Sequence, residues 1–277
     1  MAQRTFIKMH GLGNDFVVID ARNGDLKLSS AEAQAIADRH SGVGCDQLLI
    51  LEKSAKPNLA DVFMRILNSD GSEAGACGNG TRCVADLLMR EMGRDKLVIE
   101  TSAGLLDAER ASGGRVSVDM GPARLDWRDI PLKEACDTAH VPLAVGPLKD
   151  PVAINMGNPH AVFFVDDVAK VDLTALGPVI ERHAMFPERT NVEVAQLIGP
   201  DRIRLRVWER GVGITLACGS GACATAVAAA RRGLTGRKVT IVLERGELEI
   251  EWLMDGHVMM TGPVAVSFTG VLPQRAA

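Results

Sequence analysis

The alternation of apolar and polar residues along the chain predicts a protein built mainly from short strands. In the first half, strands are expected over residues 6–10, 16–19, 47–51, 62–67, 97–101, 105–109 and 115–120. Ser29, followed three residues later by Glu32, forms a capping box that predicts a helix from there to about His40. A second helix is expected over 81–90, and Gly93 is a natural end for it.

The same order of elements is expected to begin again at Val152. Strands are predicted over 162–165, 191–198, 203–208, 239–243, 248–252, 258–261 and 264–271, and helices over 175–183 and 222–231. Between the halves, residues 121–151 are rich in proline and mixed charges and have little periodicity. We therefore expect this segment to be a linker with some irregular coil.

One short motif stands at the start of the second expected helix in each half. It is Cys77-Gly78-Asn79-Gly80 in the first half and Cys218-Gly219-Ser220-Gly221 in the second. Glycines allow a tight turn, and the first turn of a helix carries unpaired N–H groups and partial positive charge. Such a helix start can bind an anion and can lower the pKa of a thiol.

The residues that precede each cysteine also match in type and spacing. Asn14 and Gln47 precede Cys77 by 63 and 30 residues, and Asn158 and Asn191 precede Cys218 by 60 and 27. Chance is a poor explanation for three matches in the same order. The sequence therefore predicts two similar domains related by a pseudo-twofold axis, each presenting its cysteine to a shared cleft.

Composition narrows the class of protein. The chain has 277 residues, of which 47% are apolar and 24% charged, enough for two domains with a full core. Its net charge is −4 and its basic residues are scattered, which argues against nucleic acid as a partner. No apolar run reaches the roughly 20 residues of a membrane span, and the N-terminus has no secretory signal. Six cysteines without such a signal indicate reduced thiols and a cytoplasmic protein.

The remaining cysteines are expected to be small buried residues rather than metal ligands. These are Cys45, Cys83, Cys136 and Cys223. Within each motif the two cysteines are separated by five or four residues that include glycines and a helix start, which disfavours zinc. We expect no metal. Acidic and hydroxyl residues over 70–73 can be interpreted as acid/base groups, but in a glycine-rich loop they more often stabilise the turn.

Several motifs together resemble the diaminopimelate epimerase family, over nearly the whole chain. They are Met9-His10-Gly11-Leu12-Gly13-Asn14-Asp15-Phe16, Gly44-Cys45-Asp46-Gln47, Asn68-Ser69-Asp70-Gly71-Ser72-Glu73, Cys77-Gly78-Asn79-Gly80-Thr81-Arg82-Cys83, Gly157-Asn158-Pro159-His160, Trp208-Glu209-Arg210-Gly211 and Ala217-Cys218-Gly219-Ser220-Gly221-Ala222-Cys223. The departures, Ser220 in place of the commoner threonine and small residues before Cys77, do not affect the chemistry.

The resemblance implies an α+β fold of two pseudo-symmetric domains, each a β-barrel-like sheet wrapped around a central helix. The first domain is expected to cover 1–120 and to be completed by the C-terminal strand in 264–277, and the second to cover 121–263. The resemblance also implies a homodimer that needs no cofactor and whose small-molecule substrate is diaminopimelate.

Inverting a carbon that carries ammonium and carboxylate requires a base on one face and an acid on the other. Only about 3% of an ordinary thiol is ionised at pH 7, from a pKa of ~8.5. A helix start can raise that share for one cysteine while the other stays protonated, and the pair would titrate together. The duplicated motif and the resemblance both assign this pair to Cys77 and Cys218. The negative charge that develops would meet the N–H groups of Gly78, Asn79, Gly219 and Ser220.

The resemblance implies roles for the other motif residues. Glu209 would neutralise the substrate ammonium or lie near the second thiol, and His160 would hydrogen-bond Glu209 and help to adjust the reactivity of a cysteine. Arg210, which can bind a carboxylate through two hydrogen bonds, would hold the distal end of the substrate with Asn68, Asn158 and Asn191. Asn14, Gln47 and Glu209 would lie nearer the reacting carbon. Which amide contacts which end stays open.

Three other functions are compatible with parts of the pattern. A proline or hydroxyproline epimerase also uses two cysteines, but its one-ended substrate has no use for Arg210 and the asparagines. A phenazine-type isomerase of similar fold would lack the paired cysteines. An amino-acid binding protein without turnover would need neither thiol.

Overall fold

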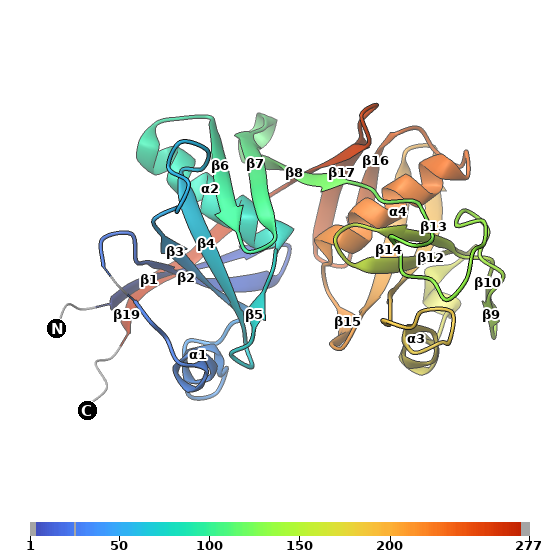
Figure 1. Ribbon diagram of the computed structural model, residues 1–277, viewed down its shortest axis with the longest axis horizontal. Helices are drawn as coiled ribbons and strands as arrows, with labels where there is room; N and C mark the ends of the chain where they lie inside the picture. The colour runs from blue at the N-terminus through green and yellow to red at the C-terminus, as the bar shows by residue number, and fades with distance from the viewer. Residues whose placement is uncertain (1–3, 25, 273–277) are drawn as a thin grey trace. The chain divides into compact units, whose positions relative to one another are not determined.

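The computed structural model describes residues 4–24 and 26–272 of the chain. The chain divides into two compact units. One runs up to Val118 and is completed by the segment from Gly262, and the other comprises Asp119–Thr261 (Figure 1). Among the described residues, no helix is long and apolar enough to cross a membrane.

The first unit is a mixed sheet whose strands follow the predicted order. Its strands are β1 (Arg4–Gly11), β2 (Asn14–Asp20), β3 (Gln47–Glu52), β4 (Val62–Asn68), β5 (Glu73–Ala74), β6 (Lys96–Thr101), β7 (Gly104–Arg110) and β8 (Val116–Pro122). β2 pairs with β3 and β4 with β6 in parallel, and the other neighbours pair antiparallel. The C-terminal strand β19 (Ala265–Leu272) pairs antiparallel with β1, beside which it lies in Figure 1.

Two helices belong to this unit, with a short 3₁₀ turn at Ser112–Gly114. Helix α1 (Ser30–Ala37) begins with the expected capping box at Ser29 and ends about one turn before His40. Helix α2 (Gly78–Met92) begins three residues earlier than predicted, directly after Cys77, and ends at Gly93 in the left-handed conformation. It packs against β1, β2, β6 and β7, so its buried side chains are covered by strands of the sheet.

The second unit repeats this order of elements. Its strands are β9 (Ala144–Val145), β10 (Leu148–Lys149), β11 (Val152–Asn155), β12 (Pro159–Phe164), β13 (Asn191–Gly199), β14 (Arg202–Glu209), β15 (Gly213–Thr215), β16 (Lys238–Leu243), β17 (Gly246–Trp252) and β18 (His257–Gly262). Its helices are α3 (Leu173–Glu181) and α4 (Gly219–Arg231), with a 3₁₀ turn at Val168–Lys170. The parallel pairs are β12 with β13 and β14 with β16.

The two units can therefore be aligned residue by residue. In the first, Phe16 lies opposite Gln47 across a parallel pair of strands, and in the second His160 lies opposite Asn191 in the same way. The short strands β5 and β15 also correspond, since each pairs antiparallel with the strand directly before it, β4 in the first unit and β14 in the second. Strands of two or three residues are too short to give a periodic pattern, which is why the sequence did not predict them.

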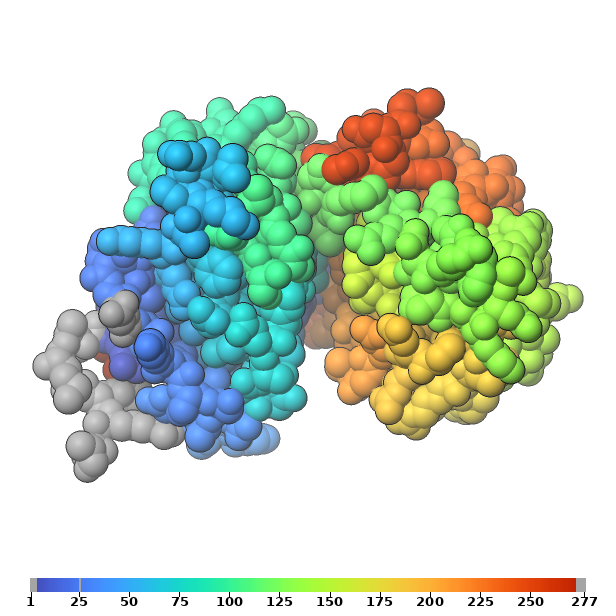
Figure 2. Space-filling model, in the orientation of Figure 1, coloured from blue at the N-terminus to red at the C-terminus, as the bar shows by residue number. Residues whose placement is uncertain are grey.

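The segment over 121–151 is irregular, as expected, but the prediction that it is a linker is wrong. Ile130, Val141 and Leu148 are completely buried in the core of the second unit, beside strand residues such as Phe163. Residues of this segment form much of the visible surface of that unit in Figure 2. Their apolar side chains are spaced without helix or strand periodicity, so the pattern alone cannot reveal that they are buried.

Candidate active site

Cys77 is the N-cap residue of α2, so its side chain lies at the open end of the helix. Its backbone is extended, and its Sγ accepts a hydrogen bond from the Gly80 N–H group at 3.4 Å. The Thr81 N–H group donates to the Cys77 carbonyl oxygen at 2.8 Å. The helix itself therefore makes no use of the N–H groups of Gly78 and Asn79. A sulfur and two backbone donors thus share the start of α2.

One amide side chain lies beside the Cys77 sulfur, and a second amide contacts the first. Sγ lies 3.9 Å from Oδ1 of Asn14, and the same oxygen accepts a hydrogen bond from Nδ2 of Asn79 at 3.1 Å. Asn14 donates through Nδ2 to Asp46 at 2.8 Å, which turns its carbonyl end toward Cys77. The guanidinium of Arg82 is completely buried and donates to Oδ1 of Asn79 at 2.9 Å. This half of the candidate site therefore contains a buried cation.

Gln47 and Asn68 lie opposite each other on β3 and β4. Gln47 donates to Oδ1 of Asn68 at 2.9 Å, and Asn68 donates to the hydroxyl of Ser72 at 3.0 Å. The N–H group of Ser72 donates in turn to Asp70 at 2.9 Å. The two amides thus form one hydrogen-bonded chain, and the polar residues after Asn68 hold the turn, as the sequence favoured.

Cys218 occupies the same position at the start of α4. Its Sγ accepts a hydrogen bond from the Gly221 N–H group at 3.4 Å, and the Ala222 N–H group donates to its carbonyl oxygen at 3.0 Å. The N–H groups of Gly219 and Ser220 have no hydrogen-bond partner within α4, as with the corresponding groups of α2. The hydroxyl of Ser220 lies 3.6 Å from Sγ.

The surroundings of Cys218 are acidic. Burial, and then the charges of Glu209 and Glu193, raise the pKa of the Cys218 thiol well above its usual range. Glu209, at the end of β14, shares a hydrogen bond with this thiol, and burial raises the pKa of Glu209 as well. Of the two places expected for Glu209, the structure shows the one beside the second thiol. These effects favour a protonated Cys218.

Glu193 is a residue of this region that the sequence did not single out. Its Oε1 lies 2.7 Å from Nδ1 of His160, and both side chains are fully buried. Nε2 of His160 lies 2.9 Å from Oδ1 of Asn158. Both ring nitrogens are therefore engaged by groups other than Glu209, so the expected hydrogen bond between His160 and Glu209 is not formed. The only signal in the sequence is one acidic residue between two valines, Val192 and Val194, in β13.

Asn191 and Arg210 are joined through the backbone. Nδ2 of Asn191 donates to the Pro159 carbonyl oxygen at 2.8 Å, and its Oδ1 accepts from the Arg210 N–H group at 2.9 Å. The Asn191 side chain is buried, so it holds the segment that carries Arg210 in place. The guanidinium of Arg210 donates to the carbonyl oxygen of Glu188 at 3.0 Å.

The other cysteines take no part in these arrangements. Cys45, Cys83 and Cys223 are buried, as predicted, and Cys136 is partly buried. Burial raises the pKa of the Cys45 thiol to about 11 and that of Cys83 to about 12, so neither is a reactive thiol. Over the described parts of the chain, no group of three or more His, Cys, Asp or Glu side chains is placed to hold a metal ion.

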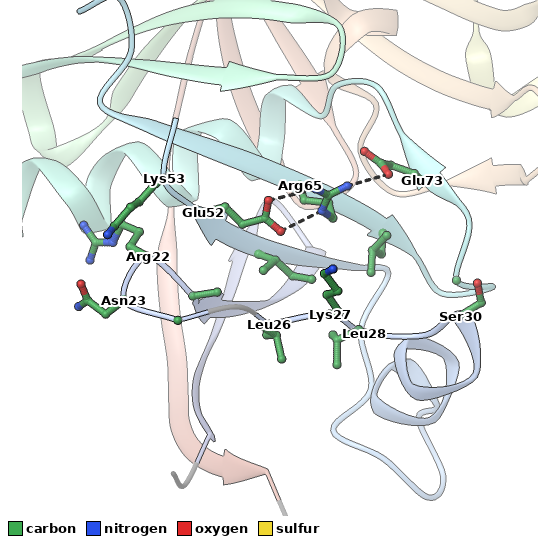
Figure 3. A pocket seen from close by; sticks show the side chains of 15 residues that line it. Arg22, Asn23, Leu26, Lys27, Leu28, Ser30, Glu52, Lys53, Arg65 and Glu73 are labelled. Atoms are coloured by element: carbon green, nitrogen blue, oxygen red, sulfur yellow. Dashed lines mark hydrogen bonds and ion pairs between the residues drawn. The ribbon is translucent and has the colours of Figure 1, made fainter. Parts of the chain in front are cut away.

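A separate hollow of about 790 Å³ opens on the first unit (Figure 3). It is lined by residues 21–24, 26–28 and 30, by residues of β3, β4 and β5, and by Lys53 and Gly71. Arg65 on its wall lies between Glu52 and Glu73 and is paired with both, at 2.9 and 3.1 Å (Figure 3). None of the residues expected to bind substrate lines this hollow, so we do not assign it to the site.

Known proteins resemble this chain over almost its full length. The model of the family described as diaminopimelate epimerase matches residues 6–125 and 152–267. A diaminopimelate epimerase of Rhodospirillum centenum is 63% identical over 98% of this chain and 93% of its own length. A diaminopimelate epimerase of Acidiphilium cryptum is 56% identical over 98% of this chain and 97% of its own length.

The fold is shared with more distant enzymes. A crystal structure of a probable proline racemase from Agrobacterium radiobacter superimposes with a TM-score of 0.69 at 16% identity, covering 98% of this chain and 93% of that protein. At this identity the likeness concerns the fold alone, whereas the relatives above match in sequence as well. By its sequence and its fold, the chain belongs to the diaminopimelate epimerase family.

Proposed function

We propose that this protein interconverts LL- and meso-diaminopimelate by transferring protons between two cysteines and the α-carbon, without pyridoxal or metal. The observation that carries this proposal is the duplicated site, in which Cys77 and Cys218 each cap a helix and accept a hydrogen bond from the third residue of that helix. The names of the relatives supply the substrate.

In the proposed reaction, the thiolate of one cysteine removes the α-proton, and the thiol of the other donates a proton to the opposite face. The product leaves with the two cysteines in exchanged protonation states. This requires both sulfurs to flank the same carbon in the working protein.

Fixed donors would stabilise the charge that develops on the substrate carboxylate. The N–H groups left over at the two helix starts are suited to this, since they carry partial positive charge and need no reorganisation. They belong to Gly78, Asn79, Gly219 and Ser220. In other enzymes, loss of one such donor raises the barrier by about 3–4 kcal/mol, so two pairs would supply a large part of the acceleration.

The remaining polar residues would select the substrate. Asn14 and Gln47 would act near the reacting carbon, and Glu209 near the Cys218 thiol. Arg210, with Asn68 and Asn158, would bind the distal amino-acid end. Asn191 would contribute by holding the Arg210 backbone, because its side-chain oxygen already accepts from that N–H group.

The cellular setting follows from the same family. We propose that the reaction serves lysine and peptidoglycan precursor synthesis in the cytoplasm and that the protein works as a homodimer. On β19, Val266 and Phe268 expose about half of their surface, 53% and 50%, which is compatible with an apolar contact between copies. Sedimentation equilibrium would test the homodimer directly.

Replacing either sulfur tests the mechanism. A hydroxyl is a far weaker acid than a thiol, so we expect Cys77→Ser and Cys218→Ser each to slow conversion of LL-diaminopimelate by roughly 10²–10⁴-fold, and Cys→Ala to abolish it. Chiral chromatography of the products measures the rate. Cys136→Ser, a thiol outside the site, is the matched control and should keep full activity. Full activity of either active-site variant would contradict the proposal.

The competing functions predict different results. A proline or hydroxyproline epimerase would convert a cyclic substrate, and diaminopimelate would be inert. A binding protein would retain its affinity for diaminopimelate after Cys77→Ala and would show no conversion even before the substitution. The distal polar residues, Arg210 above all, favour the two-ended substrate.

A further inference from the structure

The two thiols have equivalent positions, but different side chains lie behind them. Alignment of the parallel strand pairs places His160 where the first unit has Phe16, and Glu193 where it has Leu49. At these two positions the second unit therefore has ionisable side chains where the first unit has apolar ones. Both members of each pair are buried, so these differences belong to the interior of each unit.

Two further differences between aligned residues also make the surroundings of Cys218 more negative than those of Cys77. The antiparallel pairs Leu48–Leu67 and Val192–Trp208 align Asn68 with Glu209, so a neutral amide in the first unit becomes a carboxylate in the second. Five residues after each helix-capping cysteine, the buried Arg82 of the first unit is replaced by the uncharged Cys223. The second thiol therefore gains acidic neighbours and lacks the cation that accompanies the first.

Glu193 lies directly behind the start of α4. A Cβ on Gly221 would meet Oε1 of Glu193 at 2.8 Å and Sγ of Cys218 at 3.3 Å, so the carboxylate and the sulfur border the same point. At the matching point in the first unit, a Cβ on Gly80 would meet the methyl groups of Leu49 at 3.1 and 3.2 Å. Burial raises the pKa of Glu193, and whenever this carboxyl group is ionised its charge opposes a second negative charge on the sulfur.

The contacts of His160 show how Glu193 is held. The carboxylate of Glu193 contacts Nδ1 of His160, and the carbonyl oxygen of Asn158 contacts Nε2 of the same ring. The ring therefore cannot turn without losing a hydrogen bond. As a result, the amide N–H₂ end of Asn158 is the end left to meet a ligand. In the first unit the orientation is reversed, because Asn14 gives its Nδ2 to Asp46 and presents its oxygen.

We infer that Glu193 is a positioning residue that, with His160, keeps Cys218 as the protonated thiol of the resting protein and leaves the thiolate to Cys77. This inference rests on the proposed two-thiol reaction and specifies which cysteine is the acid at rest. The acidic groups that face Cys218 are Glu193 from β13 and Glu209 from β14, and His160 from β12 contacts Glu193. Of the other elements packed against α4, β11 has no charged residue. On β16 and β17, Lys238 pairs with Glu249 and Glu251, and Glu247 pairs with Arg202.

The ultraviolet absorbance of thiolates tests this inference without any substrate. The protein and its Glu193→Gln variant are titrated with base, each alongside the same protein carrying Cys218→Ser. The difference between the two curves is the ionisation of Cys218, and a parallel pair carrying Cys77→Ser gives that of Cys77. We expect Cys77 to ionise at the lower pH in the unaltered protein. In Glu193→Gln, we expect the Cys218 curve to move to lower pH by roughly one unit or more while that of Cys77 stays in place.

Two further variants make the result specific. Glu193→Leu introduces the residue that stands behind Cys77 and should shift the Cys218 curve in the same direction, even if the glutamine variant folds poorly. Glu181→Gln is the matched control: Glu181 is a buried glutamate of the same unit that accepts from Trp208 and Gly211 at 2.8 and 3.2 Å. It should leave the Cys218 curve unchanged.

Three results would overturn the inference: Cys218 ionising before Cys77 in the unaltered protein, a Cys218 curve insensitive to Glu193, or equal shifts of both thiols. Because no turnover is measured, such a result leaves the proposed function standing. Conversely, if the protein failed to convert diaminopimelate, the titrations would still show which thiol ionises first and whether Glu193 affects it.

Discussion

Gly80 and Gly221 hold the same place in the two halves of the molecule but face different neighbours. Each donates its N–H group to a cysteine sulfur, and each lacks a Cβ where a side chain packs closely. Behind Gly80 the neighbour is the flexible end of Leu49, whereas behind Gly221 it is the carboxylate of Glu193. The second position should therefore tolerate a methyl group less well.

We expect Gly221→Ala to destabilise the protein by about 1–3 kcal/mol, because the buried carboxylate at 2.8 Å from the new Cβ must move away from His160. Gly80→Ala should cost less than about 1 kcal/mol, since the Leu49 methyl groups can shift slightly and alanine favours the helix. Urea denaturation at neutral pH measures both. Equal losses of stability would show that Glu193 is free to move.

At this scale the sequence indicated most of the residues that the structure places around the two cysteines, for a physical reason. The cysteines, glycines and asparagines lie in turns and at helix starts, where residue type is tied to backbone geometry. Glu193 was missed because it lies in the middle of a buried strand, where only tertiary contacts show why an acid is present. The bond expected between His160 and Glu209 failed for the same reason, since it depended on the register between strands.

Among the secondary-structure elements, a cluster of charges joins β1, β2 and the segment after α1. Asp15 on β2 is paired with Lys8 of β1 and with Arg39, which also bonds Asp46 at 2.7 Å. Burial acts to raise the pKa of Asp15, but the hydrogen bonds from Arg39 and Lys8 prevail and hold it well below its usual range. The ionised carboxylate thus stabilises the first unit.

This stabilisation should depend on pH. Because the pKa of Asp15 is lower in the folded protein than the value of about 3.9 in an unfolded chain, its contribution is complete above that pH and is lost as the pH falls below it. We expect Asp15→Asn to lower the free energy of unfolding at neutral pH and to reduce its further loss as the pH falls from about 4 to about 2. Urea denaturation across this range measures the effect. Asp107→Asn, at an exposed position, is the control, and an identical acid response of both variants would contradict the assignment.

The irregular segment over 121–151 supplies core residues to the second unit. Val141 is completely buried and Val179 of α3 is 53% exposed, which makes them a matched pair in one unit. We expect Val141→Ala to cost about 2–3 kcal/mol of unfolding free energy, from lost burial and the cavity that remains. Val179→Ala should stay within about 0.5 kcal/mol. Similar values for both, measured by urea denaturation, would mean that the segment is only a linker after all.

These elements also show how far the fold followed from the sequence. Strands with a clear alternation and helices with a cap were predicted to within a few residues, because their signals are local. The short strands β5 and β15 and the packing of 121–151 were not predicted. They depend on contacts with residues distant in the sequence, which no local pattern records.

Across the whole molecule, duplication is the feature that connects structure with chemistry. Each unit repeats the same order of strands, the same two parallel pairs and the same cysteine-capped helix. A reaction that needs one acid and one base on opposite faces of a carbon can be served by two copies of one site. The differences between the copies, Glu193 and Glu209 against Leu49 and Asn68, would then decide which copy begins as the acid.

The central claim is that two thiols exchange the hydrogen of one carbon, and isotope incorporation tests it most directly. The protein is incubated with LL-diaminopimelate in heavy water, without pyridoxal or metal, and the label is located by mass spectrometry and nuclear magnetic resonance. We expect meso-diaminopimelate carrying one deuterium at the α-carbon of the inverted end, and none with Cys77→Ala or Cys218→Ala. Recovery of unlabelled LL-diaminopimelate, or inversion without deuterium, would contradict the claim.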